Sequence, residues 1–235
     1  MLDVHPPHPA AHTWKDFLIH VGTICVGLLI AVGLEQAVEA IHHHHQAEQI
    51  IQALQRESDA NEQVNRQDLE NLRIFTATLT QNISGLTAAS VDHGMVHYVW
   101  VKPPTRTGWL PLSNASWLMA RDSAAFPQLP AEMVRNRWRV EHTLEQVNDL
   151  GDHYFNTRYH LDAMLHRNGE AIMLTPEQRD ETLREADDLN GQLRHLYSSM
   201  DYFAILNRLA RQDEPITMDM VRKNRPENSN ALPWQ

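Results

Sequence analysis

The most apolar stretch of the chain lies near its amino terminus, at residues 14–45. Residues 17–34 carry no formal charge, and their polar exceptions are His20 and Thr23. A helix of this length spans about 27 Å, close to the hydrocarbon thickness of a bilayer. Leu28, Leu29 and Ile30 point in different directions on a helix, whereas a soluble core helix normally keeps one polar face. The pattern predicts a transmembrane helix at residues 13–41, after an irregular, proline-containing tail at 1–12.

A long helix is expected to continue from this segment into water, at residues 42–86. No Gly or Pro occurs between Gly33 and Gly85. Apolar residues recur there mostly at short intervals, at Ile50, Ile51, Leu54, Val64, Leu69, Leu72, Phe75, Leu79, Ile83 and Leu86. Between residues 55 and 63 the only apolar residue is Ala60, so the apolar seam is expected to stop for about two turns, at a neck or a kink.

Residues 87–112 lack a helical apolar period. They are predicted to form an irregular or partly β connection, the excursion, between the first long helix and the rest of the chain. Val, Tyr and Trp residues favour extended structure over 91–101, and prolines at 103, 104 and 111 disfavour helix. Trp100 and Trp109 lie in this segment, and Trp117 follows it. These three indoles are the candidate packing or ligand-contacting aromatics, because large apolar rings are costly to leave in water.

Residues 113–212 predict a helical bundle. A short helix starts at Ser113, and a longer one at 131–166 carries a coiled-coil-like apolar seam. The last helix begins with Thr175-Pro176-Glu177-Gln178, which supplies an N-cap, a proline at the first position and a capping box. Residues 213–235 show no lasting period and are expected to be a flexible tail. The fold class predicted is all-α, an antiparallel helical bundle outside the membrane.

Composition narrows the classes of function. The chain has 235 residues, a formal charge of −10 and 20 Lys and Arg, of which only three are Lys. No basic face is built, so nucleic acid is not expected as a partner. The single cysteine, Cys25, lies inside the apolar segment, which leaves the remaining domain without a disulfide, a thiolate nucleophile or a cysteine-based zinc site.

The charge distribution also predicts an orientation. Lys15 and the terminal amine precede the apolar segment, and no Lys or Arg follows it until Arg56. The positive-inside rule then places the amino terminus in the cytoplasm and the helical domain in the periplasm, in a bacterial inner membrane. A cleaved signal peptide is the competing interpretation. The apolar run is longer than a usual signal and its flank is weakly positive, which favours an uncleaved anchor.

One stripe of the predicted membrane helix differs from its other faces. It contains His20, Thr23, Gly27, Ala31 and Glu35, spaced by three or four residues. Small residues four apart let a second helix backbone approach closely in lipid. We therefore expect association through this stripe with itself or with other membrane subunits; the alternative is that small residues are simply common in membrane helices.

The histidines are the candidate metal ligands. Within the run 42–45, only His42 and His45 share a helix face, and a zinc or copper site needs further ligands. A polar collar at the membrane exit is the alternative. Two copies of His20 could ligate haem iron, although a polar interfacial role is commoner. No cofactor is therefore expected.

No catalytic residues are predicted. The chain has no HExxH, no paired Glu-x-x-His, no G-x-S-x-G and no glycine-rich phosphate or dinucleotide loop. An enzyme is therefore not expected.

The segment WKDFLIHVGTICVGLLIAVGLEQAVEAIHHHHQ resembles the amino-terminal anchor of a family of small uncharacterised bacterial membrane proteins. Residues 112–120, LSNASWLMA, are similar to a later segment of the same group. The resemblance implies a single-pass inner-membrane protein with a helical domain, and it transfers no activity or cofactor.

The sequence thus favours a non-catalytic, single-pass membrane protein that is an accessory or scaffold subunit of a larger complex or forms a homo-oligomer. The alternatives are a periplasmic ligand-sensing helical module, which lacks an output domain in cis, and a metal- or haem-binding membrane protein.

Overall fold

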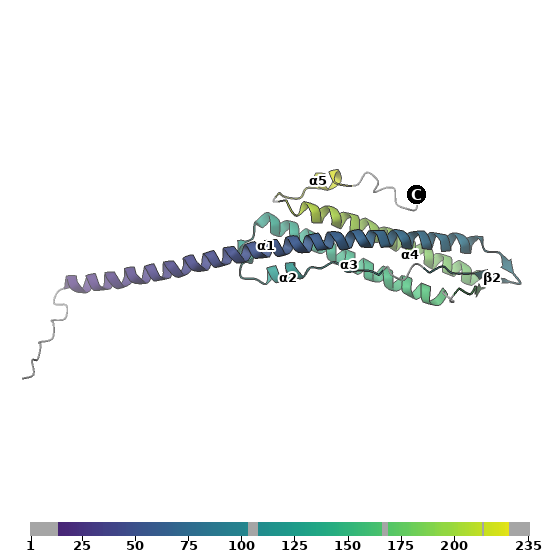
Figure 1. Cartoon of the computed structure of the whole chain (residues 1–235), viewed down its shortest axis with the longest axis horizontal. Helices are drawn as coiled ribbons and strands as arrows, with labels where there is room; N and C mark the ends of the chain where they lie inside the picture. Colours follow the sequence, from purple (N-terminus) through teal and green to yellow (C-terminus); the bar gives the residue numbers. More distant parts are fainter. Residues whose placement is uncertain (1–13, 103–107, 166–168, 213, 226–235) are drawn as a thin grey trace, which may run out of the picture. The chain divides into compact units, whose positions relative to one another are not determined.

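The computed structural model describes residues 14–102, 108–165, 169–212 and 214–225. In chain order its elements are α1 (Trp14–Ala88), β1 (Val91–Asp92), β2 (Met95–Tyr98), α2 (Ala115–Arg121), the 3-10 helix η1 (Phe126–Gln128), α3 (Ala131–Leu165), β3 (Ile172–Leu174), α4 (Pro176–Leu209) and α5 (Met218–Lys223). Helices dominate, as the sequence predicted, with one small sheet (Figure 1). The chain divides into two compact units, Met1–Gln49 and Ile50–Gln235, and α1 contributes residues to both.

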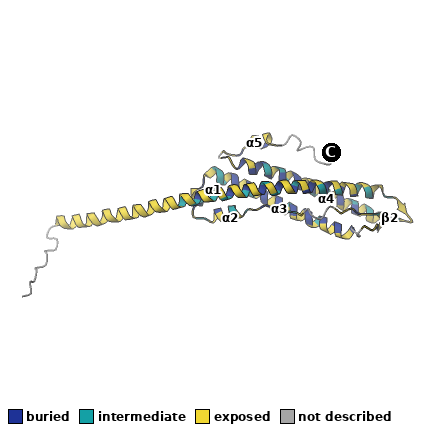
Figure 2. Ribbon diagram, in the orientation of Figure 1, coloured by how far each residue is buried: buried dark blue, intermediate teal, exposed yellow. Residues whose placement is uncertain are grey.

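The described part of the first unit is helical throughout. Every residue from 14 to 42 is exposed, which Figure 2 shows as one colour on all sides of the helix. The helix is continuous because its backbone groups bond within the segment and no proline interrupts it. The contacts of side chains in this segment are therefore local, such as the stacking of the Trp14 ring on the Phe17 ring one turn away.

The second unit is a bundle of three long helical segments. The part of α1 after Ile50 and α3 run in the same direction, since Arg137 contacts the Leu54 carbonyl and Phe75 packs on Phe155 further along both helices. They can run parallel because the chain between them returns along the bundle before α3 begins.

Helix α4 runs antiparallel to α1, which agrees with the predicted arrangement. The Ser58 hydroxyl donates to the Asn207 amide oxygen over 2.8 Å, and the Asn65 amide donates to the Met200 carbonyl over 3.3 Å. The order of these pairs is reversed between the two helices. The short connection through β3 places α4 beside α3, against which it makes its main contacts.

Helix α1 presents a continuous seam to the bundle, with alternating steps of four and three residues. The seam contains Leu54, Ser58, Asn61, Asn65, Asp68, Leu72, Phe75, Leu79, Asn82 and Leu86, all buried. Apolar residues are missing from the seam over 55–63, as expected, but the buried seam and the helix both continue through this interval, so it is not a break between elements. Ser58 and Asn61 occupy seam positions there, and hydrogen bonds make these buried polar side chains tolerable.

The excursion after α1 contains the predicted β structure. Strands β1 and β2 form an antiparallel hairpin whose two-residue turn, His93 and Gly94, has positive φ angles of 49° and 81°. Strand β3, which was not predicted, adds antiparallel to β2 and gives the sheet order β1-β2-β3. A side chain at Gly85 would meet the Tyr98 ring, so glycine permits the sheet to lie close to α1.

The start of α4 is as the sequence predicted. The Gln178 backbone N–H donates to the Thr175 hydroxyl over 3.2 Å, and the Thr175 N–H donates to the Gln178 side chain over 2.9 Å. This reciprocal pair satisfies two backbone donors that a helix start otherwise leaves unpaired.

The prediction of a flexible tail over 213–235 requires correction at residues 214–225; residues 213 and 226–235 lie outside the described part. Asn136 holds this segment by donating to the Glu214 carbonyl over 2.9 Å and accepting the Ile216 N–H over 3.3 Å. Ile216 and Val221 are buried, and α5 follows with Thr217 as its N-cap. This order was not predictable from the sequence because the segment has few regularly spaced apolar residues, and Asn136 holds it through backbone groups.

Candidate functional site

The apolar segment of the first unit is the most distinctive surface in the described chain. Fourteen large apolar side chains lie exposed there: Trp14, Phe17, Leu18, Ile19, Val21, Ile24, Val26, Leu28, Leu29, Ile30, Val32, Leu34, Val38 and Ile41. Soluble proteins rarely expose a contiguous apolar surface of this extent. By length and composition, this helix is suited to crossing a membrane, and none of its most apolar window is buried.

The polar residues of the proposed association stripe are partly satisfied within their own helix. The Thr23 hydroxyl donates to the Ile19 carbonyl over 2.8 Å, and His20 Nδ1 lies 3.1 Å from the Asp16 carbonyl. Such local bonds lower the cost of placing these side chains in lipid. Gly27 has no described atom within 4 Å of the position that a side chain would take, so its face is open to a second helix.

Ala31 and Glu35 complete this stripe and are exposed like their neighbours. The structure contains one chain, and association through the stripe stays a prediction.

The histidine run interacts with side chains one turn away. His42 Nε2 lies 2.9 Å from the Gln46 amide nitrogen, and His45 Nδ1 lies 3.6 Å from a Glu48 oxygen. No group of three or more His, Cys, Asp or Glu side chains in the described ranges is placed to hold a metal ion. Metal binding by His42 and His45 would need further ligands, and it stays a prediction.

The three candidate tryptophans do not converge on one site. The Trp109 ring stacks on Phe155, with centroids 5.8 Å apart, and lies against Gly151, where any side chain would overlap it. Trp117 is buried and packs edge-on against Phe126 of η1. Trp100 lines a small cavity in the bundle.

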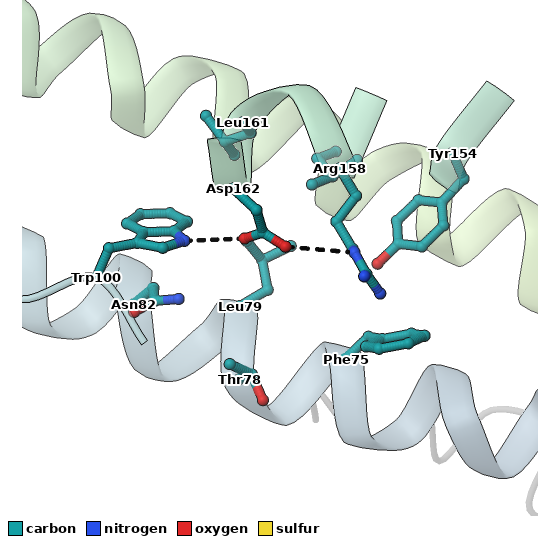
Figure 3. A pocket seen from close by; sticks show the side chains of 10 residues that line it. Phe75, Thr78, Leu79, Asn82, Trp100, Tyr154, Arg158, Leu161 and Asp162 are labelled. Atoms are coloured by element: carbon teal, nitrogen blue, oxygen red, sulfur yellow. Dashed lines mark hydrogen bonds and ion pairs between the residues drawn. The ribbon is translucent and has the colours of Figure 1, made fainter. Parts of the chain in front are cut away.

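The cavity beside Trp100 lies between α1, α3 and α4 (Figure 3). Its lining consists of Phe75, Thr78, Leu79, Asn82, Trp100, Tyr154, Arg158, Leu161, Asp162 and Leu189. The volume is about 20 Å³, which accommodates one water molecule and is far below that of a metabolite site. This size argues against ligand sensing at Trp100.

A buried ion pair forms one wall of this cavity. Arg158 Nε lies 3.5 Å from Asp162 Oδ2, and the two side chains are 9% and 7% exposed. The Trp100 indole N–H donates to the other Asp162 oxygen over 3.0 Å (Figure 3). Asp162 thus joins the excursion to α3 and supplies the counter-charge that a buried guanidinium requires.

Aromatic rings complete the environment of Arg158. Its guanidinium carbon lies 4.1 Å from the centre of the Phe75 ring and 4.6 Å from that of Tyr159, within cation–π range. Within the described ranges, Arg158 Nε and Nη1 and Asp162 Oδ2 have no hydrogen-bond partner. Burial raises the pKa of the neighbouring Tyr154, which keeps its phenol neutral. The arrangement is that of a structural ion pair.

The sequence held a signal for this pair. The apolar seam of α3 consists of Val140, Leu144, Val147, Tyr154, Leu161 and Leu165, and it leaves two gaps, from Val147 to Tyr154 and from Tyr154 to Leu161. Gly151 and Arg158 fall within those gaps, at the heptad spacing, and both are buried. A charged residue at a seam position, with Asp162 four residues later, predicts a buried ion pair.

A second polar cluster fixes the excursion to the bundle through asparagines. Asn82 binds both backbone groups of Val101, and Asn61 binds both of Ser113. Asn148 of α3 does the same for Leu112, at 2.8 and 2.9 Å. Each side-chain amide replaces the backbone partner that an extended segment would find in a sheet.

Asp68 lies in the same region and is 1% exposed. Burial raises the pKa of Asp68 from 3.8 to about 7, while the Leu110 backbone and the Asn71 side chain partly oppose this increase. Neither carboxylate oxygen has a well-formed hydrogen bond within the described ranges. A carboxyl in this setting exchanges its proton near neutral pH.

Comparison with known proteins adds no functional assignment: no protein-family model, curated protein or solved structure matches the chain.

Proposed function

We propose that this chain is a non-catalytic single-pass membrane protein, anchored by the apolar part of α1, whose helical unit binds other membrane subunits or a second copy of itself. The exposure of fourteen large apolar side chains on one helical segment is the observation that carries the proposal. Lipid would cover these side chains on every face, because a bilayer surrounds a spanning helix completely.

Association is proposed through the stripe that contains Gly27. Lipid provides little hydrophobic drive between helices, so close backbone packing at small residues becomes important. The support for this face is the spacing of Thr23, Gly27 and Ala31 at four-residue intervals, and the space at Gly27 is open to a second helix. A stable partner or second copy would make the chain an accessory or scaffold subunit.

A bacterial inner membrane is the proposed location, with the amino terminus in the cytoplasm and the helical unit in the periplasm. The support is the position of Lys15 before the apolar segment, with the next basic residue at Arg56. We also propose that the chain belongs to a family of bacterial membrane proteins with the same type of anchor. The support for this is the sequence resemblance alone.

Alkaline carbonate extraction tests membrane anchorage. The full-length chain should remain in the pellet with the vesicles and dissolve only when detergent is added. The intact mass should show that residues 1–41 are retained, since cleavage after the apolar segment would instead identify a signal peptide. Recovery of the chain in the carbonate supernatant would refute the proposal.

Exchange of Gly27 tests the association face. Gly27→Ile should reduce cross-linking between copies, or the recovery of partner subunits on native purification from membranes, because a branched side chain prevents close backbone contact. Gly33→Ile is the matched control, since Gly33 is also open and lies on another face of the helix. Equal behaviour of the two variants would rule out the Gly27 stripe.

A further inference from the structure

An open groove lies on the second unit between α3, α4 and the segment that carries α5. Its volume is about 490 Å³, within the range of small-molecule sites. The buried side chains of Leu206, Ile216 and Val221 contribute an apolar floor. The groove is therefore concave and partly apolar, and its volume is more than twenty times that of the cavity beside Trp100.

The rim of this groove exposes aromatic rings. Trp138 is 64% exposed, although a large indole is usually buried. Its ring stacks on the His142 ring at an interplanar angle of 15°, with centroids 6.4 Å apart. Tyr202 and Met218 line the groove and are also exposed. A rigid flat wall above an apolar floor suits a ligand with a flat apolar body.

The charge of the lining is opposite to that of the whole chain. Arg139 carries a positive charge and His142 acquires one on protonation, and none of the groove-lining residues in the described structure is acidic. The chain as a whole has a formal charge of −10. The Arg139 guanidinium is held in place because Nη1 donates to the Ile216 carbonyl over 2.7 Å. Its charge also acts on the Glu132 carboxylate, and its further N–H groups can donate to a ligand carboxylate.

Four acidic residues adjoin lining residues in the sequence, Glu141, Glu145, Asp201 and Asp219, and the last two of them lie close to cations. Asp201 precedes Tyr202, and the nearby Arg225 and Arg73 partly oppose the increase in its pKa that burial causes. Asp219 follows Met218 and lies 3.8 Å from Arg222. These cations moderate the repulsion that the two carboxylates would exert on an anionic ligand.

We propose that this groove binds a small organic anion with a flat apolar body, of the size of an aromatic carboxylate. The ring lies against Trp138 and over the floor, and the carboxylate faces Arg139 and His142. This site is confined to the second unit and is independent of how the first unit is anchored.

Three probes with the same ring and different charge test this inference on the full-length protein in nanodiscs: indole-3-acetate, indole-3-acetamide and tryptamine. Equilibrium dialysis, corrected with empty nanodiscs, should show saturable binding of one anion per chain, weaker binding of the neutral amide and the weakest binding of the cation. Trp138→Ala should weaken indole-3-acetate binding about tenfold, because the stacking wall is lost. Met119→Ala, at a residue 75% exposed on α2, is the control for loss of an exposed apolar side chain.

A variant and a matched control test whether binding requires the charge of Arg139. Arg139→Gln should weaken indole-3-acetate binding up to about fivefold and leave indole-3-acetamide binding nearly unchanged, since the side chains are exposed and solvent screens the pair. Arg66→Gln removes the same charge from an exposed position on α1 that does not line the groove, and it should have no effect. Absence of saturable binding, equal binding of the three probes, or equal effects of Trp138→Ala and Met119→Ala would overturn the inference.

Discussion

At the scale of single residues, Asp68 makes stability depend on pH. Its pKa rises from 3.8 to about 7 on folding, so the folded chain binds a proton more tightly than the unfolded chain. The contribution of Asp68 to the free energy of unfolding should therefore be largest below pH 4, fall as pH increases towards 7, and level off above that. The full difference corresponds to roughly 4 kcal/mol, an upper bound for one carboxyl.

Asp68→Asn should remove this dependence, because the amide keeps the shape and cannot ionise. We expect the variant to be more stable than the parent at pH 8, by up to a few kcal/mol, with the advantage disappearing near pH 4. Urea unfolding followed by circular dichroism at several pH values measures this. Asp149→Asn, at an exposed position, is the control for net charge, and a pH profile of Asp68→Asn that parallels the parent would contradict the account.

The Arg158–Asp162 pair also belongs to the residue scale. Asp162→Ala should destabilise the bundle by about 3–5 kcal/mol, since it leaves a buried guanidinium without its counter-charge and the Trp100 indole without an acceptor. Adding Arg158→Met should recover part of the loss, because a thioether packs well against the Phe75 and Tyr159 rings. Alanine at Glu132, whose partner Arg135 is exposed, should cost less than 1 kcal/mol.

At the scale of elements, the extended segment before α2 depends on asparagine side chains. Asn148→Ala removes both hydrogen bonds to Leu112, and we expect a loss of about 1–3 kcal/mol. Hydrogen exchange at residues 108–113 should become faster, while α4 keeps its protection. Asn114→Ala is less suited as a test because Asn114 binds a side chain, Glu141. Unchanged exchange over 108–113 would show that packing alone holds the segment.

The regular helices were predictable because their signals are local. The start of α4 follows from Thr175 and Gln178, and the extent of α3 follows from its apolar spacing and the glycine that comes after it. The polar part of the α1 seam was misread because Ser58 and Asn61 look like surface residues in sequence. Their burial depends on partners far along the chain, such as Asn207 and Ser113, which spacing alone does not identify.

Tertiary features of the candidate sites were less predictable for the same reason. Sequence singled out Trp100 as an aromatic that packs or binds a ligand, but its partner Asp162 is 62 residues away. The groove at Trp138 combines α3, α4 and a segment that was expected to be flexible. The apolar part of α1, in contrast, was recognisable from composition because it needs no partner in the chain.

At the scale of the whole molecule, the central claim is that the apolar part of α1 lies in lipid. The only cysteine, Cys25, is in this segment and is exposed in the isolated chain. Its thiol should therefore react readily in water and be protected inside a bilayer. This residue provides a label at the centre of the claim without any added cysteine.

The most direct measurement is modification of Cys25 by a membrane-impermeant maleimide in membranes opened on both faces. We predict that Cys25 stays unmodified until the membranes are dissolved and the protein is denatured. A Cys25→Ser, Gln212→Cys variant, with its thiol at an exposed position just after α4, should react at once. Modification of Cys25 in intact bilayers as fast as that of the control thiol would contradict the membrane anchor and the function proposed from it.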